Sequence, residues 1–155
     1  MGRRLASEGP FDHAYDVPWT TVHTGLVHGG TALNIVPKDC SFDFEFRHLA
    51  AHDPRALLAE VRSFADSKLV PEMHKVQADT GITWEELSSF PGLTTGEDAE
   101  IVQRAKAASG HNSTSKVAFG TEAGLFEAAG IPTVVCGPGD IEQAHKPNEF
   151  VALDQ

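Results

Sequence analysis

The chain has 155 residues, of which 41% are hydrophobic, so it is long enough for one ordinary domain or two small ones and has the composition of a folded protein. Its 22 acidic side chains against 12 lysines and arginines give a formal net charge of −10, which disfavours nucleic acids and anionic membranes as partners. No apolar run approaches the ~20 residues of a transmembrane helix and the start lacks the apolar core of a signal peptide, so we expect a cytoplasmic location.

The first 88 residues predict a series of helices and strands. We expect the end of a helix and an irregular connection over residues 1–18, then strands over 19–27 and 41–47, a helix from Pro54 to about Val70, and a strand over 82–87. Asp53 is the expected N-cap of the helix, with Pro54 at its first position. In the strand 41–47 the three phenylalanines recur with a period of two and therefore share one face.

Pro91-Gly92 marks a boundary, after which the pattern predicts a helix over 98–109 that ends at Gly110. A strand over 116–119, a helix over 121–129 closed by Gly130 and a strand over 132–136 follow. We expect these three elements to form a parallel, right-handed strand-helix-strand unit.

Two glycine-bearing loops follow the two strands of this unit. Ligands collect at the carboxyl ends of parallel strands, where we expect both Gly120-Thr121-Glu122 and the loop 137–140. His145 comes next on the second loop. The arrangement predicts half of an active site.

The stretch 116–150 resembles the C-terminal end of the M20 family of zinc-dependent metallopeptidases and amidohydrolases, which includes acetylornithine deacetylases and succinyl-diaminopimelate desuccinylases. Upstream, the segment Gly29 to Pro37 and the strand ending in Arg47 resemble that family's lid or dimerisation domain. Gly-Thr-Glu-Ala-Gly at 120–124 is nearest to the deacetylases, because desuccinylases usually carry Ser-Asp after Gly-Thr.

The resemblance implies an α/β fold with an α+β lid. Residues 1–18 would be the end of a lid helix and a connection, 19–88 an incomplete ferredoxin-like dimerisation domain, and 89–155 the C-terminal β-α-β part of a zinc-exopeptidase-like catalytic domain. The first lid strand and most of the first lid helix have no counterpart in the sequence. Open strand edges then predict a homodimer or a strand-exchanged oligomer.

By the same resemblance, the intact enzyme hydrolyses N-acetyl-L-ornithine to ornithine and acetate, a step of arginine biosynthesis, with two zinc ions and a glutamate as general base. His145 matches the C-terminal zinc ligand of the family. The other ligands and the general base have no match here, and Glu85-Glu86 falls in a predicted strand that sends them to opposite faces. We therefore expect a C-terminal portion of the enzyme, inactive alone.

Two predicted substrate contacts lie in the lid region. The resemblance implies that Arg47 binds the α-carboxylate of an N-acylated amino acid through its planar fork, although an ion pair with Asp43 or Glu45 is the alternative. Asn34 resembles the residue that reaches the substrate of the other subunit, where an amide can stabilise an oxyanion. A turn-stabilising role is its alternative.

Three more candidates, Gly120, Thr121 and Glu122, resemble the substrate-contacting loop. Glycine lets backbone N–H groups approach an anionic substrate. Thr121 has an alternative role as a helix cap, and Glu122 could attract the cationic ornithine side chain or merely favour the helix dipole.

Two functions from other classes remain open. The chain could be a non-catalytic association module, whose lid strands pair with another subunit or with a separately made N-terminal half. It could also be a cysteine hydrolase using Cys136, His145 and Asp140, although the G-x-C-x-G elbow expected for that geometry is absent. Otherwise we expect both cysteines to be reduced, partly buried thiols.

Overall fold

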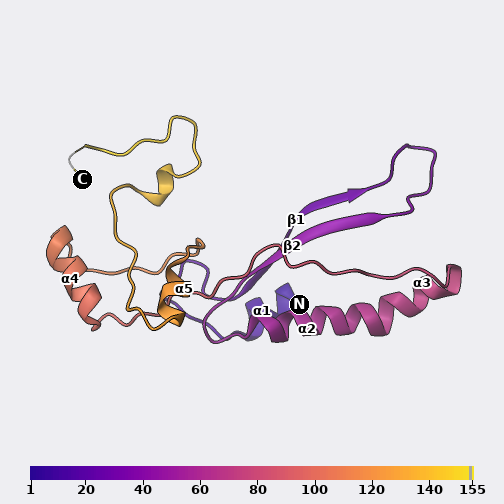
Figure 1. Cartoon of the computed structure of the whole chain (residues 1–155), viewed down its shortest axis with the longest axis horizontal. Coiled ribbons are helices and arrows are strands. Elements are labelled where there is room, and N and C mark those ends of the chain that lie inside the picture. Colours follow the sequence, from indigo (N-terminus) through magenta and orange to yellow (C-terminus); the bar gives the residue numbers. More distant parts are fainter. Residues whose placement is uncertain (154) are drawn as a thin grey trace. The chain divides into compact units, whose positions relative to one another are not determined.

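The computed structural model of the chain describes residues 1–153 and residue 155. The chain divides into two compact units (Figure 1). The first consists of Met1–Gly92 and Ser115–Thr121, and the second of Leu93–Thr114 and Glu122–Gln155. The architecture mixes helices with a small antiparallel sheet of two strands. No helix in the described part of the chain is long and apolar enough to cross a membrane.

The sheet of the first unit is a hairpin of β1 (Thr21–Gly29) and β2 (Cys40–Arg47). The strands are antiparallel, with Thr21 opposite Arg47 at one end and Gly29 opposite Cys40 at the other. The register shifts between Thr24 and Leu26, so the extra residue Gly25 forms a bulge. Both strands predicted in this region are confirmed, with boundaries moved by one or two residues.

An aromatic row on β2 confirms the predicted shared face of the phenylalanines. The Phe44 ring centre lies 6.0 Å from that of Phe42 and 5.5 Å from that of Phe46. Trp84 meets Phe44 edge-on at 6.3 Å, while the Arg62 guanidinium of the long helix lies 5.5 Å from the Trp84 ring centre. Trp84 therefore fills the space between hairpin and helix, and Figure 1 shows its segment returning between them.

The strand predicted over Ile82–Leu87 is wrong, because residues 81–96 have no regular secondary structure. A segment becomes a strand only where a neighbouring strand completes the ladder of hydrogen bonds, and the described sheet contains β1 and β2 alone. Side-chain contacts of Trp84 hold the segment instead.

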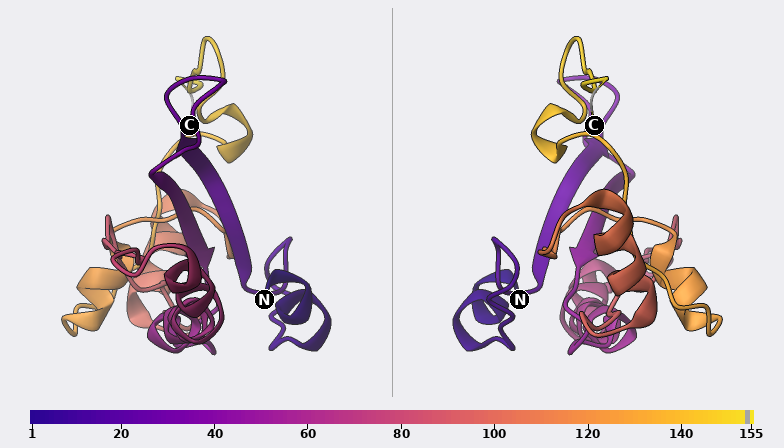
Figure 2. Two further views of the ribbon diagram at one scale, coloured as in Figure 1. Left: turned by 90° about the vertical axis from the view of Figure 1, so that its right-hand side faces the viewer. Right: turned by 90° about the vertical axis from the view of Figure 1, so that its left-hand side faces the viewer.

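The first unit contains α1 (Gly2–Glu8) and one long continuous helix. The long helix consists of α2 (Pro54–Phe64), the π-helical turn η1 (Ala65–Leu69) and α3 (Val70–Val76). Figure 2 shows this long helix end-on beneath the hairpin. The Asp53 cap is confirmed, since its carboxylate accepts the Arg55 N–H at 2.9 Å. The long helix continues to Val76, beyond the end predicted near Val70. Val70 N–H donates to Ala65 O, five residues back, so a π-turn carries the helix past Pro71, which has no N–H to donate.

The second unit contains α4 (Glu100–Ser109), α5 (Ala123–Ala128) and the short 3-10 helix η2 (Ile141–Gln143). Gly110 ends α4 in the left-handed conformation, as predicted, with φ 72°. The strands predicted over Lys116–Phe119 and Pro132–Cys136 are wrong, because both segments lack regular structure. Without a paired neighbour for either strand, the predicted parallel strand-helix-strand unit does not form.

Candidate functional site

Arg47 ends β2 with its guanidinium in two contacts. Nε donates to Glu45 Oε1 at 2.8 Å, so the ion pair considered as an alternative is present. Nη1 donates to the carbonyl oxygen of Ala118 at 3.3 Å, although the two residues are 71 positions apart. The side chain remains 57% exposed, and its fork is therefore open to an anionic ligand.

The contact between Arg47 and Ala118 brings the segment 115–121 to the end of the hairpin within the first unit. Gly120 follows two residues later and packs against the Phe90 ring. A Cβ added to Gly120 would lie 2.6 Å from Phe90 Cζ, closer than real contacts allow. A larger residue at this position would therefore force the Phe90 ring to move, a constraint that sequence reasoning missed.

Asn34 lies in the exposed loop between the strands, at the end of the hairpin away from Arg47. The Ile35 N–H donates to Ala32 O at 3.2 Å, which places Asn34 inside a turn. A strand of eight residues separates the two candidates by roughly 25 Å at the usual rise per residue. One chain therefore does not bring Asn34 and Arg47 together.

Glu122 and His145 belong to the second unit. Glu122 directly precedes α5, and its carbonyl oxygen accepts the Leu125 N–H at 2.9 Å, while its side chain is exposed and makes no cap bond. The helix thus begins at Ala123, two residues after the predicted start at Thr121, which is half-buried. His145 is exposed, has a positive φ of 61°, and donates its N–H to Glu149 Oε2 at 3.0 Å.

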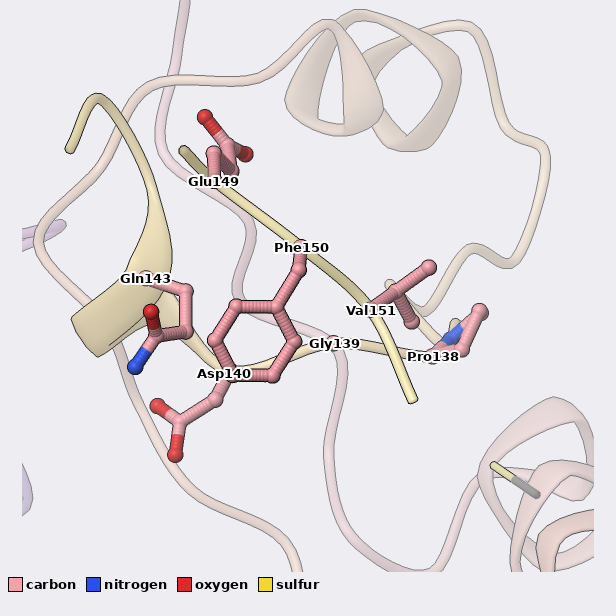
Figure 3. Close-up of a pocket in the computed structure, with 7 residues that line it drawn as sticks. All are labelled: Pro138, Gly139, Asp140, Gln143, Glu149, Phe150 and Val151. Atoms are coloured by element: carbon pink, nitrogen blue, oxygen red, sulfur yellow. The ribbon is translucent and has the colours of Figure 1, made fainter. Parts of the chain in front are cut away.

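A shallow hollow of about 420 Å³ lies in the loops of the second unit between Pro138 and Val151 (Figure 3). Its lining residues are Pro138, Gly139, Asp140, Gln143, Glu149, Phe150 and Val151. Gly139 N–H donates to Gln155 Oε1 at 3.1 Å, and Asp140 Oδ1 accepts the Glu142 N–H at 2.9 Å to cap η2. The loop that carries His145 thus joins two sides of this hollow, between Gln143 and Glu149.

Zinc takes about four ligands, and the described residues contain no group of three or more His, Cys, Asp or Glu side chains that could hold a metal ion. His145 could supply one nitrogen. The described residues therefore do not fit a zinc centre by themselves.

Residues 4–73 match the model of the peptidase dimerisation domain of the M20 family. Acetylornithine deacetylase from Myxococcus xanthus is 33% identical over 143 residues, which cover 92% of this chain and 36% of the relative. The acetylornithine deacetylase of Pasteurella multocida is 31% identical over 91% of the chain and 35% of its own length. The chain is thus similar to M20 proteins over most of its length.

A third M20 relative, the N-acetyl-L-citrulline deacetylase of Xanthomonas campestris pv. campestris, is 35% identical over 84% of the chain and 34% of its own length. The chain thus spans about a third of the length of these relatives. Both cysteines are exposed, so the expected partial burial is wrong, and with Asp140 capping η2 the cysteine hydrolase alternative gains no support.

Sequence reasoning missed two polar clusters, because their members are far apart along the chain. In the first unit Lys116 pairs with Asp12 at 2.6 Å. In the second unit Glu127 accepts the Thr94 N–H and hydroxyl at 2.9 Å each, and the Thr95 hydroxyl at 2.7 Å. Partial burial alone would raise the pKa of Glu127, but these hydrogen bonds outweigh it and lower the pKa below the usual 4.5.

Proposed function

We propose that the chain forms the dimerisation region and part of the substrate site of an acetylornithine deacetylase-like hydrolase. The observation that carries the proposal is the identity of about a third with acetylornithine deacetylases over most of the chain. The reaction is hydrolysis of N-acetyl-L-ornithine to ornithine and acetate, within cytoplasmic arginine biosynthesis. The dimerisation match over residues 4–73 supports a dimerisation domain in the first part of the chain. We assign residues 1–18 to the end of a lid helix and a connection, 19–88 to an incomplete ferredoxin-like lid, and 89–155 to the catalytic domain.

Arg47 binds the α-carboxylate of the substrate in this proposal. Its half-exposed fork stands at a strand end beside the segment of Gly120, where backbone N–H groups can approach the same anion. To engage both carboxylate oxygens, the guanidinium exchanges its exposed ion pair with Glu45 for the ligand, and an exposed pair of this kind contributes little to stability. Thr121 and Glu122 continue this contact loop.

Asn34 serves the second subunit of a homodimer. It lies at the far end of the hairpin from Arg47, so a site that uses both residues takes them from different chains. The dimerisation domain supports this division of the site between subunits. The Asn34 amide donates to the substrate carbonyl oxygen, where negative charge develops.

His145 contributes one ligand to the zinc that the family uses. The described residues contain no group of three or more His, Cys, Asp or Glu side chains that could hold a metal ion, so we expect the 155-residue chain to hydrolyse no substrate alone. Detectable metal-dependent deacetylation by this chain, lost in His145→Ala, would contradict that expectation.

A hybrid enzyme tests the proposed function. This chain replaces the matching third of the Myxococcus xanthus acetylornithine deacetylase, and amine release is measured with N-acetyl-L-ornithine, N-acetyl-L-citrulline and N-succinyl-L,L-diaminopimelate. We expect metal-dependent hydrolysis, fastest with N-acetyl-L-ornithine. A hybrid that is folded and dimeric but inactive on all three compounds would refute the proposal. Faster hydrolysis of the citrulline or succinyl compound would refute N-acetyl-L-ornithine as the substrate and assign that compound instead.

The second candidate is a non-catalytic association module, which the dimerisation domain and the exposed Leu26 and Val27 on β1 favour. It predicts that the chain dimerises by sedimentation or binds the complementary part of the relative without conferring hydrolysis. A chain that stays monomeric at high concentration and binds no such part would sink this idea.

A further inference from the structure

Lys116 makes two contacts with the connection that follows α1. Its Nζ donates to Asp12 Oδ2 at 2.6 Å across 104 positions of sequence, and it stands 5.4 Å from the centre of the Tyr15 ring. The two paired side chains are 48% and 34% exposed. An ion pair and a cation–π contact thus meet at one ammonium group.

Hydrogen bonds within its own loop hold Asp12 in place independently of Lys116. Its N–H donates to Pro18 O at 2.8 Å, which closes the connection on itself, and its Oδ1 accepts the Ala14 N–H at 3.0 Å. The remaining oxygen, Oδ2, faces Lys116. The hydrogen bond between them lowers the pKa of the Asp12 carboxyl and raises the pKa of the Lys116 ammonium, so both groups favour their charged forms.

Ala118 and Gly120, in the same segment as Lys116, make further contacts. Ala118 O accepts from Arg47 Nη1 at 3.3 Å, and Gly120 packs under the Phe90 ring. Residues 115–121 belong to neither described strand, so no ladder of backbone hydrogen bonds sets their position. Side-chain contacts contribute to it instead, and in the contact between Lys116 and Asp12 both partners are charged.

We propose that Asp12, Tyr15 and Lys116 form a clamp of positioning residues, which fixes residues 116–120 so that Ala118 O holds the Arg47 guanidinium in orientation for a substrate carboxylate. The inference rests on the proposed role of Arg47 in substrate binding. The clamp acts through position, because exposed ion pairs of this kind contribute little to overall stability.

Nuclear magnetic resonance of the 155-residue chain tests the clamp without any activity. The chain has one tyrosine, so its ring signals are unambiguous. Lys116→Met and Asp12→Asn each remove the charge pair, and Asn can still accept the Ala14 N–H. We expect both variants to shift the Tyr15 ring, the Ala118 amide and the Arg47 Nε–Hε signals, whereas Lys116→Arg keeps the Arg47 signal near its wild-type position.

Lys75→Met is the matched control, because it breaks the exposed Lys75–Glu72 pair of the same 2.6 Å length on α3. It should leave the Arg47 signal unchanged. If the Tyr15 signals move in Lys116→Met and Asp12→Asn while the Arg47 and Ala118 signals stay, the contact is a local ion pair and the clamp is overturned.

In the hybrid enzyme the clamp predicts a rise in KM of about tenfold for Lys116→Met with kcat within about twofold, because Arg47 binds a group remote from the reacting bond. Lys116→Arg should restore KM. Equal KM in wild type and Lys116→Met would contradict positioning. A hybrid that is inactive both as the wild type and as Lys116→Met would refute the proposed function. The spectra of the 155-residue chain would still test the clamp.

Discussion

Thr20→Val removes one buried hydroxyl at the end of the hairpin that carries Arg47. Thr20 is 0% exposed, and its Oγ1 accepts the Leu49 N–H at 3.0 Å and pairs with His52 Nδ1 at 2.7 Å. Thr20 directly precedes β1, and Leu49 follows β2 by two residues. One hydroxyl therefore joins the two chain ends of the hairpin.

Valine keeps the branched shape of threonine, so the loss comes from hydrogen bonding and not from a cavity. Leu49 is 7% exposed, so its N–H is left without water when the hydroxyl is gone, at a cost of about 1–3 kcal/mol. The His52 ring is only half-buried and can turn to solvent, which adds about 0.5–1 kcal/mol. We expect the free energy of unfolding to fall by about 1.5–4 kcal/mol.

Urea unfolding followed by tryptophan fluorescence measures this change, since Trp19 adjoins Thr20. Thr24→Val, on the exposed surface of β1, is the matched control and should change stability by no more than about 0.5 kcal/mol. Thr20→Ser keeps the hydroxyl and should lose about 1 kcal/mol. If Thr20→Val is harmless and Thr20→Ser is the more damaging variant, the methyl group matters and the hydrogen-bond reasoning is refuted.

Gly120→Ala should cost about 1 kcal/mol because its Cβ meets the Phe90 ring, and a double-mutant cycle should show no cost in a Phe90→Ala background. Asp53→Ala should lower stability by about 1 kcal/mol through loss of the α2 cap, with Asp53→Ser close to wild type in thermal unfolding. The lowered pKa of Glu127 means that its stabilisation is present above pH 4.5 and is lost as the pH falls through the folded-state pKa. The free energy of unfolding, measured by denaturant titration at several pH values between about 5 and 3, should therefore fall less steeply with decreasing pH in Glu127→Gln than in the wild type. Equal slopes would contradict this.

Local signals in the sequence predicted local structure well. Asp53 before Pro54 specified a helix start, and Gly110 a helix end, because each satisfies or shapes the backbone within one turn. The alternating phenylalanines of β2 likewise revealed their face. The segments 82–87, 116–119 and 132–136 misled the strand predictions, because strand formation depends on a partner strand that the segment itself does not specify.

The candidate site shows the same division between near and distant contacts. The ion pair of Arg47 with Glu45 was among the predicted alternatives, since residues two apart on a strand share a face. The contacts of Arg47 with Ala118 and of Lys116 with Asp12 join residues 71 and 104 positions apart, and no periodicity connects such residues. The resemblance of the surrounding motifs marked Arg47 and His145 as candidates, but the contacts of these two residues follow from the fold.

The measurement that tests the central claim most directly is kcat/KM of the hybrid enzyme for N-acetyl-L-ornithine with lysine in place of Arg47. Lysine keeps the charge but loses the bidentate fork, so Arg47→Lys should reduce kcat/KM by about 30-fold, equivalent to about 2 kcal/mol. Arg55→Lys, in the first turn of α2, should leave kcat/KM unchanged. A folded, dimeric hybrid with no hydrolysis, or an active one indifferent to Arg47→Lys, would contradict the account.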